Sequence, residues 1–76
     1  MNQSDLIEAL ENLLGKEVIY IEYPGAIPFK GVLQKQEEKA LDYVISDGEK
    51  EIEFHYMESD VTPPNIVWGH VMEGFN

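Results

Sequence analysis

The segment LDYVISDGEKEIEFHY, residues 41–56, carries the strongest secondary-structure signal in the chain. Residues 41–46 are rich in β-branched and aromatic side chains, which are typical of strands. Asp47-Gly48 is a dipeptide that favours a tight hairpin turn. In residues 51–56 apolar side chains alternate with acidic or polar ones, so this second strand is expected to have one buried face and one wet face. The segment therefore predicts a β-hairpin.

Three further strands are expected on either side of this hairpin. Residues 18–23 are mostly β-branched or aromatic and end at a Pro-Gly turn, which marks a strand. In residues 29–34, Phe29, Gly31 and Leu33 alternate with Lys30, Val32 and Gln34, which indicates a second strand. Pro28 precedes this strand, and proline is tolerated in a sheet only at the start of a strand or on an edge strand. After the break at residues 62–64, the sequence IVW at residues 66–68 indicates a short fifth strand.

A helix is expected before the strands, over residues 4–14. Apolar side chains recur there at spacings of three and four, which places them on one stripe of an α-helix. These residues are Leu6, Ile7, Leu10, Leu13 and Leu14. Ser4 is expected to cap the helix at its N-terminus, and Gly15 to end it in a left-handed conformation.

This order of elements predicts a mainly β domain with one N-terminal α-helix. Because closure removes the exposed edges of a small sheet, we expect a closed or nearly closed five-stranded barrel over residues 16–70, followed by a tail at residues 71–76. No linker or repeat divides the sequence, so residues 1–76 are assigned to a single domain. The chain has no cysteine, so packing rather than disulfides or cysteine-bound zinc must hold it together.

Residues 15–63 resemble the SH3-like barrels of small bacterial and phage proteins. In those barrels a Tyr-x-aliphatic-x-Asp strand, a turn, an aromatic strand and an acidic-aliphatic-x-Pro step follow one another. The positions that match this pattern are Tyr43, Ile45, Asp47, Phe54, Asp60, Val61 and Pro63. The resemblance implies an SH3-like architecture and names no ligand, because one fold hosts many functions.

A second resemblance is to the Sm-like (Hfq-like) fold of ring-forming RNA chaperones. The order of a helix, a strand and then residues 29–33 (FKGVL) is similar to that family. It implies an alternative function, that of an RNA-associated module acting in an oligomer. The family's basic Tyr-Lys-His motif is replaced here by Phe54-His55-Tyr56 between acidic neighbours, so direct nucleic-acid binding is not expected.

No residue pattern in the sequence indicates catalysis or metal binding. The sequence has neither a Gly-x-Ser-x-Gly elbow nor a serine paired locally with a histidine. His55 and His70 are fifteen residues apart and lack the spacing of a helical ligand pair. An EF-hand register from Asp42 to Glu53 fails because Val44 stands at a ligand position. We therefore expect a protein that is not an enzyme and uses no metal and no cofactor.

The charge distribution is the feature of the sequence that bears most on function. Fifteen acidic residues against five lysines and no arginine give a net charge of −10, which repels a phosphate backbone. Residues 37–60 hold nine acids and two lysines, so this interval alone carries a net charge of −7. We interpret it as a surface that engages a basic surface of a partner protein, and a purely solubilising role is the alternative.

The candidate partner-binding residues are of two kinds. The acidic ones lie in or beside the predicted hairpin, and the aromatic ones are of the types that interfaces favour at their centres. They are Asp42, Asp47, Glu49, Glu51 and Glu53, together with Tyr23 and Trp68. Such a module would act by competition, as an inhibitor or adaptor of bacterial or phage origin.

The sequence also bears on location and self-association. Residues 1–16 have no lysine before Lys16 and no apolar segment of signal-peptide length, so we expect a cytoplasmic protein without membrane contact. We expect a homodimer, formed through whichever apolar surface one copy leaves uncovered. The candidate surfaces are the apolar helix face and the C-terminal residues Val67, Trp68 and Phe75.

Overall fold

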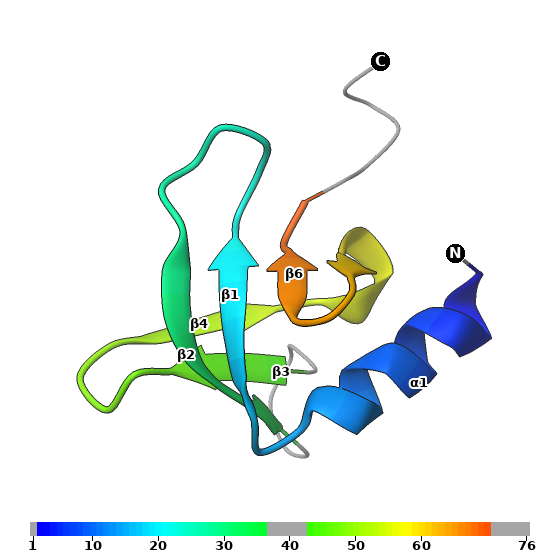
Figure 1. Cartoon of the computed structure of the whole chain (residues 1–76), viewed down its shortest axis with the longest axis horizontal. Helices are drawn as coiled ribbons and strands as arrows, with labels where there is room; N and C mark the ends of the chain where they lie inside the picture. The colour runs from blue at the N-terminus through cyan, green and yellow to red at the C-terminus, as the bar shows by residue number, and fades with distance from the viewer. Residues whose placement is uncertain (1, 37–42, 71–76) are drawn as a thin grey trace.

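The computed structural model describes residues 2–36 and 43–70. Within them α1 (Gln3–Leu13) precedes six strands and one 3-10 turn. In chain order these are β1 (Glu17–Ile21), β2 (Phe29–Lys35), β3 (Tyr43–Ser46), β4 (Glu51–Phe54), η1 (Tyr56–Glu58), β5 (Asp60–Thr62) and β6 (Ile66–Trp68). The described chain is therefore mainly β with one N-terminal α-helix, as the sequence predicts (Figure 1).

The six strands form one mixed sheet in the order β4-β3-β2-β1-β6-β5. Neighbouring strands are antiparallel except β1 and β6, which are parallel. Figure 1 shows β3 and β4 running across the direction of β1, so the sheet is strongly bent. No ladder joins the outer strands β4 and β5 within residues 2–36 and 43–70. The prediction of a closed five-stranded barrel over residues 16–70 is therefore wrong, because the described residues form six strands in an open sheet.

The additional strand arises on the C-terminal side of the hairpin. β4 ends at Phe54, two residues earlier than expected, because the backbone turns into η1 soon after it. β5 then pairs with β6 across the turn at Pro63-Pro64. The sequence does not predict β5, because a three-residue strand that begins with Asp60 is too short to show an alternating pattern.

α1 begins at Gln3, one residue before the expected start at Ser4. Its N-cap is Asn2, whose Oδ1 accepts a hydrogen bond from the backbone N–H of Asp5 (2.8 Å), so Ser4 is not the cap. Asparagine and serine cap helices about equally well, which is why the sequence does not decide between them. At the other end Gly15 has a φ of +80°, the left-handed conformation predicted for it.

The core lies between α1 and the inner face of the bent sheet. Its buried side chains come from the helix and from every strand. They are Leu6, Leu10 and Leu13 of α1, Val18 and Tyr20 of β1, Leu33 of β2, Tyr43 and Ile45 of β3, Phe54 of β4, Val61 of β5 and Val67 of β6. The ring centroids of Tyr20 and Phe54 lie 5.6 Å apart, and those of Tyr43 and Phe54 lie 5.8 Å apart. α1 contacts β5 and η1, so the helix covers that end of the sheet.

Gly69, directly after β6, is required by the close approach of Tyr20. A Cβ built at Gly69 would overlap the hydroxyl of Tyr20 and lie 2.7 Å from its Cζ. Tyr20 is only 2% exposed. Burial, with a smaller contribution from the negative charge of Glu22, raises the pKa of Tyr20 to about 12. The phenol therefore stays neutral well into the alkaline range.

We expect Gly69→Ala to lower the free energy of unfolding by about 1–3 kcal/mol, the usual cost of overpacking a dense site. Urea unfolding followed by circular dichroism measures this loss. Tyr20→Phe in the same chain removes the overlapping hydroxyl, so the double variant should lose less stability than the sum of the two single variants. Strictly additive losses would show that the Tyr20 hydroxyl is not the obstacle.

We also expect the protein to lose stability at alkaline pH as Tyr20 ionises. Its folded pKa of about 12 lies above the ordinary value of 10.0, so the unfolded chain releases this proton first. The stabilisation is fully present below the ordinary pKa and is lost as pH rises through the folded pKa. Unfolding midpoints of the wild type should therefore fall relative to those of Tyr20→Phe across that interval. Parallel profiles of the two proteins would contradict the assignment.

Candidate protein-interaction surface

The β3–β4 hairpin brings four of the predicted acidic residues together, and all four are exposed. They are Asp47 and Glu49 in the turn, and Glu51 and Glu53 on β4. We call residues 47–53 the acidic hairpin. The fifth predicted acid, Asp42, lies outside the described residues.

Asp47 shapes the turn of the acidic hairpin. Its Oδ1 accepts hydrogen bonds from the backbone N–H groups of Lys50 (2.8 Å) and Glu49 (2.9 Å). Gly48 has a φ of +97°, which glycine adopts without strain. The N–H groups of Lys50 and then of Glu49 hold the pKa of Asp47 below its ordinary value of 3.8. The carboxylate of Asp47 is thus already used within the hairpin.

The other three carboxylates of the acidic hairpin are directed outwards. Glu51 and Glu53 are two residues apart on β4, so their side chains leave the same face of the strand. Oε2 of Glu53 accepts a hydrogen bond from Nε2 of Gln36 (2.7 Å). The hairpin's lysine, Lys50, places its Nζ 5.6 Å from the ring centroid of Phe29 on β2. The exposed surface of the acidic hairpin therefore carries a negative charge, with four carboxylates against one lysine.

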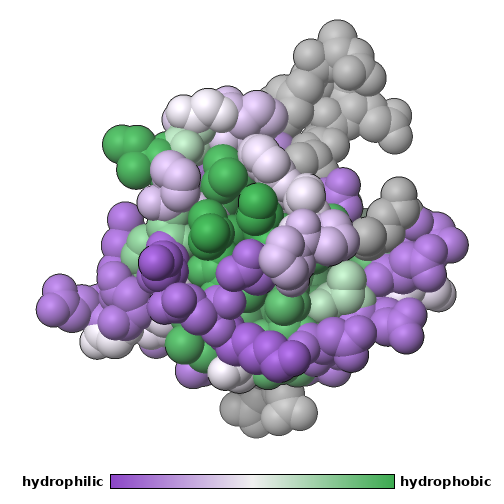
Figure 2. Space-filling view, in the orientation of Figure 1, coloured by the Kyte–Doolittle hydropathy of each residue, from purple (hydrophilic) through white to green (hydrophobic). Residues whose placement is uncertain are grey.

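A second surface, formed by β1, β2 and β6, is apolar. Along β1 the even-numbered residues are buried, so the odd-numbered ones point away from the core. The outward apolar side chains are Ile19 and Ile21 of β1, Val32 of β2, and Ile66 and Trp68 of β6. The registers place Ile19 beside Ile66 and Ile21 beside Trp68, whereas Val32 lies opposite Glu17 and is diagonal to Ile19. All five are half-buried, and we call them the outer face. In Figure 2 hydrophobic atoms gather over β1 and are surrounded by hydrophilic ones.

The predicted aromatic residues lie apart from the acidic hairpin. Trp68 is on β6, where its Nε1 donates a hydrogen bond to Oγ1 of Thr62 (2.9 Å). Tyr23 lies between β1 and β2 and is 51% exposed, and Ile27 in the same connection is 90% exposed. Three strands separate β4 from β6 in the sheet. The structure therefore divides the predicted residues into two groups.

The outer surface of the sheet connects the acidic hairpin with the outer face. Val32 lies opposite Ser46 on β3, and Ser46 lies opposite Glu51 on β4. Neighbouring strands are about 4.8 Å apart, so Val32 and Glu51 are separated by about 10 Å across the sheet. A partner of ordinary size can contact both surfaces at once.

The sequence prediction missed the four aliphatic residues of the outer face. A signal for this face is nevertheless present, because residues 18–21 are apolar at every position. An unbroken apolar run is typical of a strand that is covered on both faces. In β1 the core covers only the side chains of the inner face, and the outward side chains Ile19 and Ile21 are half-buried.

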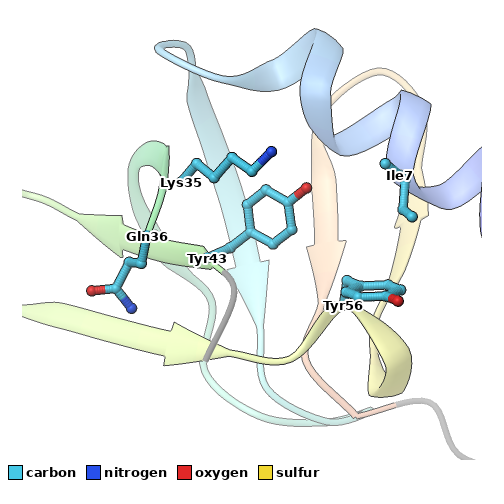
Figure 3. A pocket seen from close by; sticks show the side chains of 5 residues that line it. All are labelled: Ile7, Lys35, Gln36, Tyr43 and Tyr56. Carbon is cyan, nitrogen blue, oxygen red and sulfur yellow. The ribbon is translucent and has the colours of Figure 1, made fainter. Parts of the chain in front are cut away.

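Two hollows flank the ring of Tyr56 beside α1. The first has a volume of about 170 Å³ and is lined by Ile7, Lys35, Gln36, Tyr43 and Tyr56 (Figure 3). The second has a volume of about 260 Å³ and is lined by Gln3, Leu6, Tyr56, Met57 and Ser59. Polar groups around the first hollow contact one another: Oε2 of Glu11 accepts a hydrogen bond from the Tyr43 hydroxyl (2.9 Å) and lies 3.4 Å from Nζ of Lys35. These contacts stabilise the junction of α1 with the sheet.

Within residues 2–36 and 43–70, no three histidine, aspartate or glutamate side chains lie together in a way that could hold a metal ion. The helices in these ranges include none with the length and apolar character needed to cross a bilayer. No protein-family model, curated protein or solved structure matches the chain.

We expect Asp47→Ala to lower the thermal unfolding midpoint more than Asp47→Asn does, because asparagine keeps an oxygen that can accept the two backbone hydrogen bonds. The folded pKa of Asp47 is depressed, so its charged form contributes stability above the ordinary pKa that is lost as pH falls through the folded value. Asp47→Asn should lack this acid-dependent loss. Thermal unfolding at neutral and acidic pH tests both statements. An identical acid dependence in the wild type and in Asp47→Asn would contradict the second.

Proposed function

We propose that this chain is a non-catalytic protein-binding module whose acidic hairpin docks on a basic surface of a partner protein. The observation that carries the proposal is a hydrogen-bonded turn that displays Glu49 and Glu51. Among the described residues, neither carboxylate has a side-chain partner. Exposed carboxylates without an internal partner leave their field available to steer association with a basic protein.

The outer face supports the proposal by offering apolar contact area beside the charge. Protein interfaces combine an apolar centre with a polar rim, and tryptophan is common among the residues that dominate binding energy. Trp68 and Ile21 lie opposite each other on β6 and β1 and are both half-buried. A partner held by the acidic hairpin could therefore bury the outer face as well.

The chemistry of the acidic hairpin also suggests how the module acts. A partner that uses its basic surface to bind nucleic acid would be blocked by a competing negative surface. We therefore assign the module a role as an inhibitor or adaptor in the cytoplasm of a bacterium, encoded by the bacterium or by a phage. This assignment follows the resemblance to SH3-like proteins, which we keep as the proposed family. The Sm-like RNA-associated oligomer is the alternative.

Self-association remains part of the proposal, with one surface excluded. The apolar helix face is buried in the chain's own core through Leu6, Leu10 and Leu13, so it is not available to a second copy. Of the predicted C-terminal residues, Val67 is fully buried and Phe75 lies outside the described residues, so a homodimer would use the outer face, which includes Trp68. The net charge of −10 per chain opposes such a contact at low salt.

Affinity capture from a lysate of the cells that encode the chain tests the proposed function. We expect the wild type to retain a basic protein at low salt and to release it at high salt, because salt screens exposed charges. The double variant Glu49→Gln, Glu51→Gln should lose this protein, since it removes both free carboxylates and leaves the bond between Glu53 and Gln36 intact.

The matched control is the double variant Glu8→Gln, Glu22→Gln, which removes the same charge from exposed positions outside the acidic hairpin. It should capture the partner as the wild type does. Equal capture by all three proteins would refute a role for the acidic hairpin. If RNA co-purifies in place of a basic protein, the Sm-like alternative is correct.

A further inference from the structure

The described sheet has two edge strands, β4 and β5, and they differ in how far they are protected. β5 has only three residues and is followed by Pro63. The N–H of Val61 on β5 donates to Oδ1 of Asp60 (2.8 Å), and α1 contacts this strand. β4 has no neighbouring strand on its outer side among the described residues, and Glu51 and Glu53 on it are exposed. β4 is therefore the open edge.

The hydrogen bonds of the turn show which backbone groups of β4 face outwards. In an antiparallel ladder, hydrogen-bonded residue pairs alternate with pairs that are not hydrogen-bonded. The N–H of Asp47 donates to the carbonyl of Lys50 (3.1 Å), which makes these two residues a hydrogen-bonded pair. Glu51 and Glu53 then fall at positions that are not hydrogen-bonded to β3. Their N–H and C=O groups point away from the sheet.

The hydrogen bonds between β2 and the segment before β1 lead independently to the same orientation of the β4 backbone. On β2, the N–H of Leu33 donates to the carbonyl of Lys16 (3.1 Å), and its carbonyl accepts from Gly15 (2.8 Å), so Leu33 directs its backbone groups away from β3. Its β3 neighbour Ile45 must therefore bond to the opposite strand, where it lies across from Ile52. Alternation again leaves the backbone groups on either side of Ile52 directed outwards.

We propose that the open edge of β4 accepts an extended segment of the partner as an additional antiparallel strand, with basic side chains opposite Glu51 and Glu53. The inference rests on the proposed function, because it specifies the form in which a basic partner meets the acidic hairpin. Residues directly opposite each other in a ladder share one face, so each basic side chain lies beside a carboxylate. The residue between them faces the half-buried Ile52, where an apolar side chain fits. The recognised pattern is basic, apolar, basic.

Charge complementarity selects this occupant over a second copy of the chain. Pairing β4 with another β4 would bring glutamates together on one face, and like charges in adjacent strands are destabilising. The net charge of −10 on each copy adds to this repulsion. A strand with lysine or arginine at alternate positions replaces repulsion with attraction and satisfies the outward backbone groups.

A capped peptide of seven residues, with lysine and valine alternating between terminal threonines, is a direct probe of the edge. In the proposed register the lysine N–H groups face β4 and the valine N–H groups face solvent. Methylating the backbone nitrogens of the valines should leave the affinity close to that of the parent peptide. Methylating the backbone nitrogens of the lysines should weaken the affinity by about tenfold or more at unchanged charge, because it removes hydrogen bonds across the edge. Amide shifts of Glu51 and Glu53 in an NMR titration report the binding.

Two variants at one position separate backbone pairing from charge. Glu53→Gln removes the carboxylate and keeps the N–H, so it should weaken binding and reduce its salt dependence. Glu53→Pro also removes the outward N–H and should weaken binding further. Proline fits there because that N–H is not bonded to β3. Unchanged amide shifts of Ile45 and Ile52 would show that the hairpin remains folded.

The outcomes separate the strand inference from the proposed function. If all three peptides bind equally well and respond equally to salt, attraction by charge survives and strand addition is wrong. Strand addition is also wrong if the parent peptide leaves the amide signals of Glu51 and Glu53 unmoved. In either case the capture experiment with Glu49→Gln, Glu51→Gln still decides the proposed function by itself.

Discussion

The contact between the rings of Tyr20 and Phe54 sets the shape of the whole molecule. Tyr20 is on β1 and Phe54 on β4, and two strands lie between them in the sheet. In a flat sheet, strands separated in this way would be about 14 Å apart. The ring centroids are 5.6 Å apart, so the sheet must bend until its inner face closes over the two rings. Tyr43, stacked beside Phe54, and the leucines of α1 fill the space that the bend encloses.

The bend also determines what the molecule shows to other proteins. It turns the hairpin of β3 and β4 across the direction of β1, although one sheet carries both the acidic hairpin and the outer face (Figure 1). It leaves β4 and β5 as separate edges. α1 contacts β5, whereas the carboxylates of Glu51 and Glu53 line β4. Charge on an edge strand discourages unselective pairing, and here the same charge would select a basic partner.

The parts of the fold that depend on neighbours in sequence could be predicted, and those that depend on distant pairing could not. The apolar stripe ending at Gly15 and the turn at Asp47-Gly48 are local signals, and the structure confirms the helix and the hairpin. The number of strands and the openness of the sheet depend on how β5 and β6 pair, and each has only three residues. The local pattern of residues 66–68 predicts β6 correctly, but β5 takes its conformation from the neighbour that it meets, and the pairing of both strands is not encoded locally.

The candidate site divides in the same way. Alternation along the chain was enough to place Glu51 and Glu53 on one face of a strand, because that relation is local. The use of the Asp47 carboxylate within the turn could have been anticipated, since aspartate often bonds to the backbone two residues on. The outer face could not be assembled from the sequence, because it requires knowing that Ile19 lies beside Ile66.

The pairing of Ile19 with Ile66 joins a strand near the start of the described chain to the last one. During synthesis, β1 and β2 leave the ribosome long before β6 does. In that interval the side of the β1 backbone that pairs with β6 has no partner. Contacts between such distant parts of a chain slow folding, and an unpaired strand edge exposes a nascent chain to wrong partners. Residues 18–21 of β1 are also the longest unbroken apolar run in the sequence. Until β6 emerges, this apolar run therefore lacks the strand that pairs with it on that side.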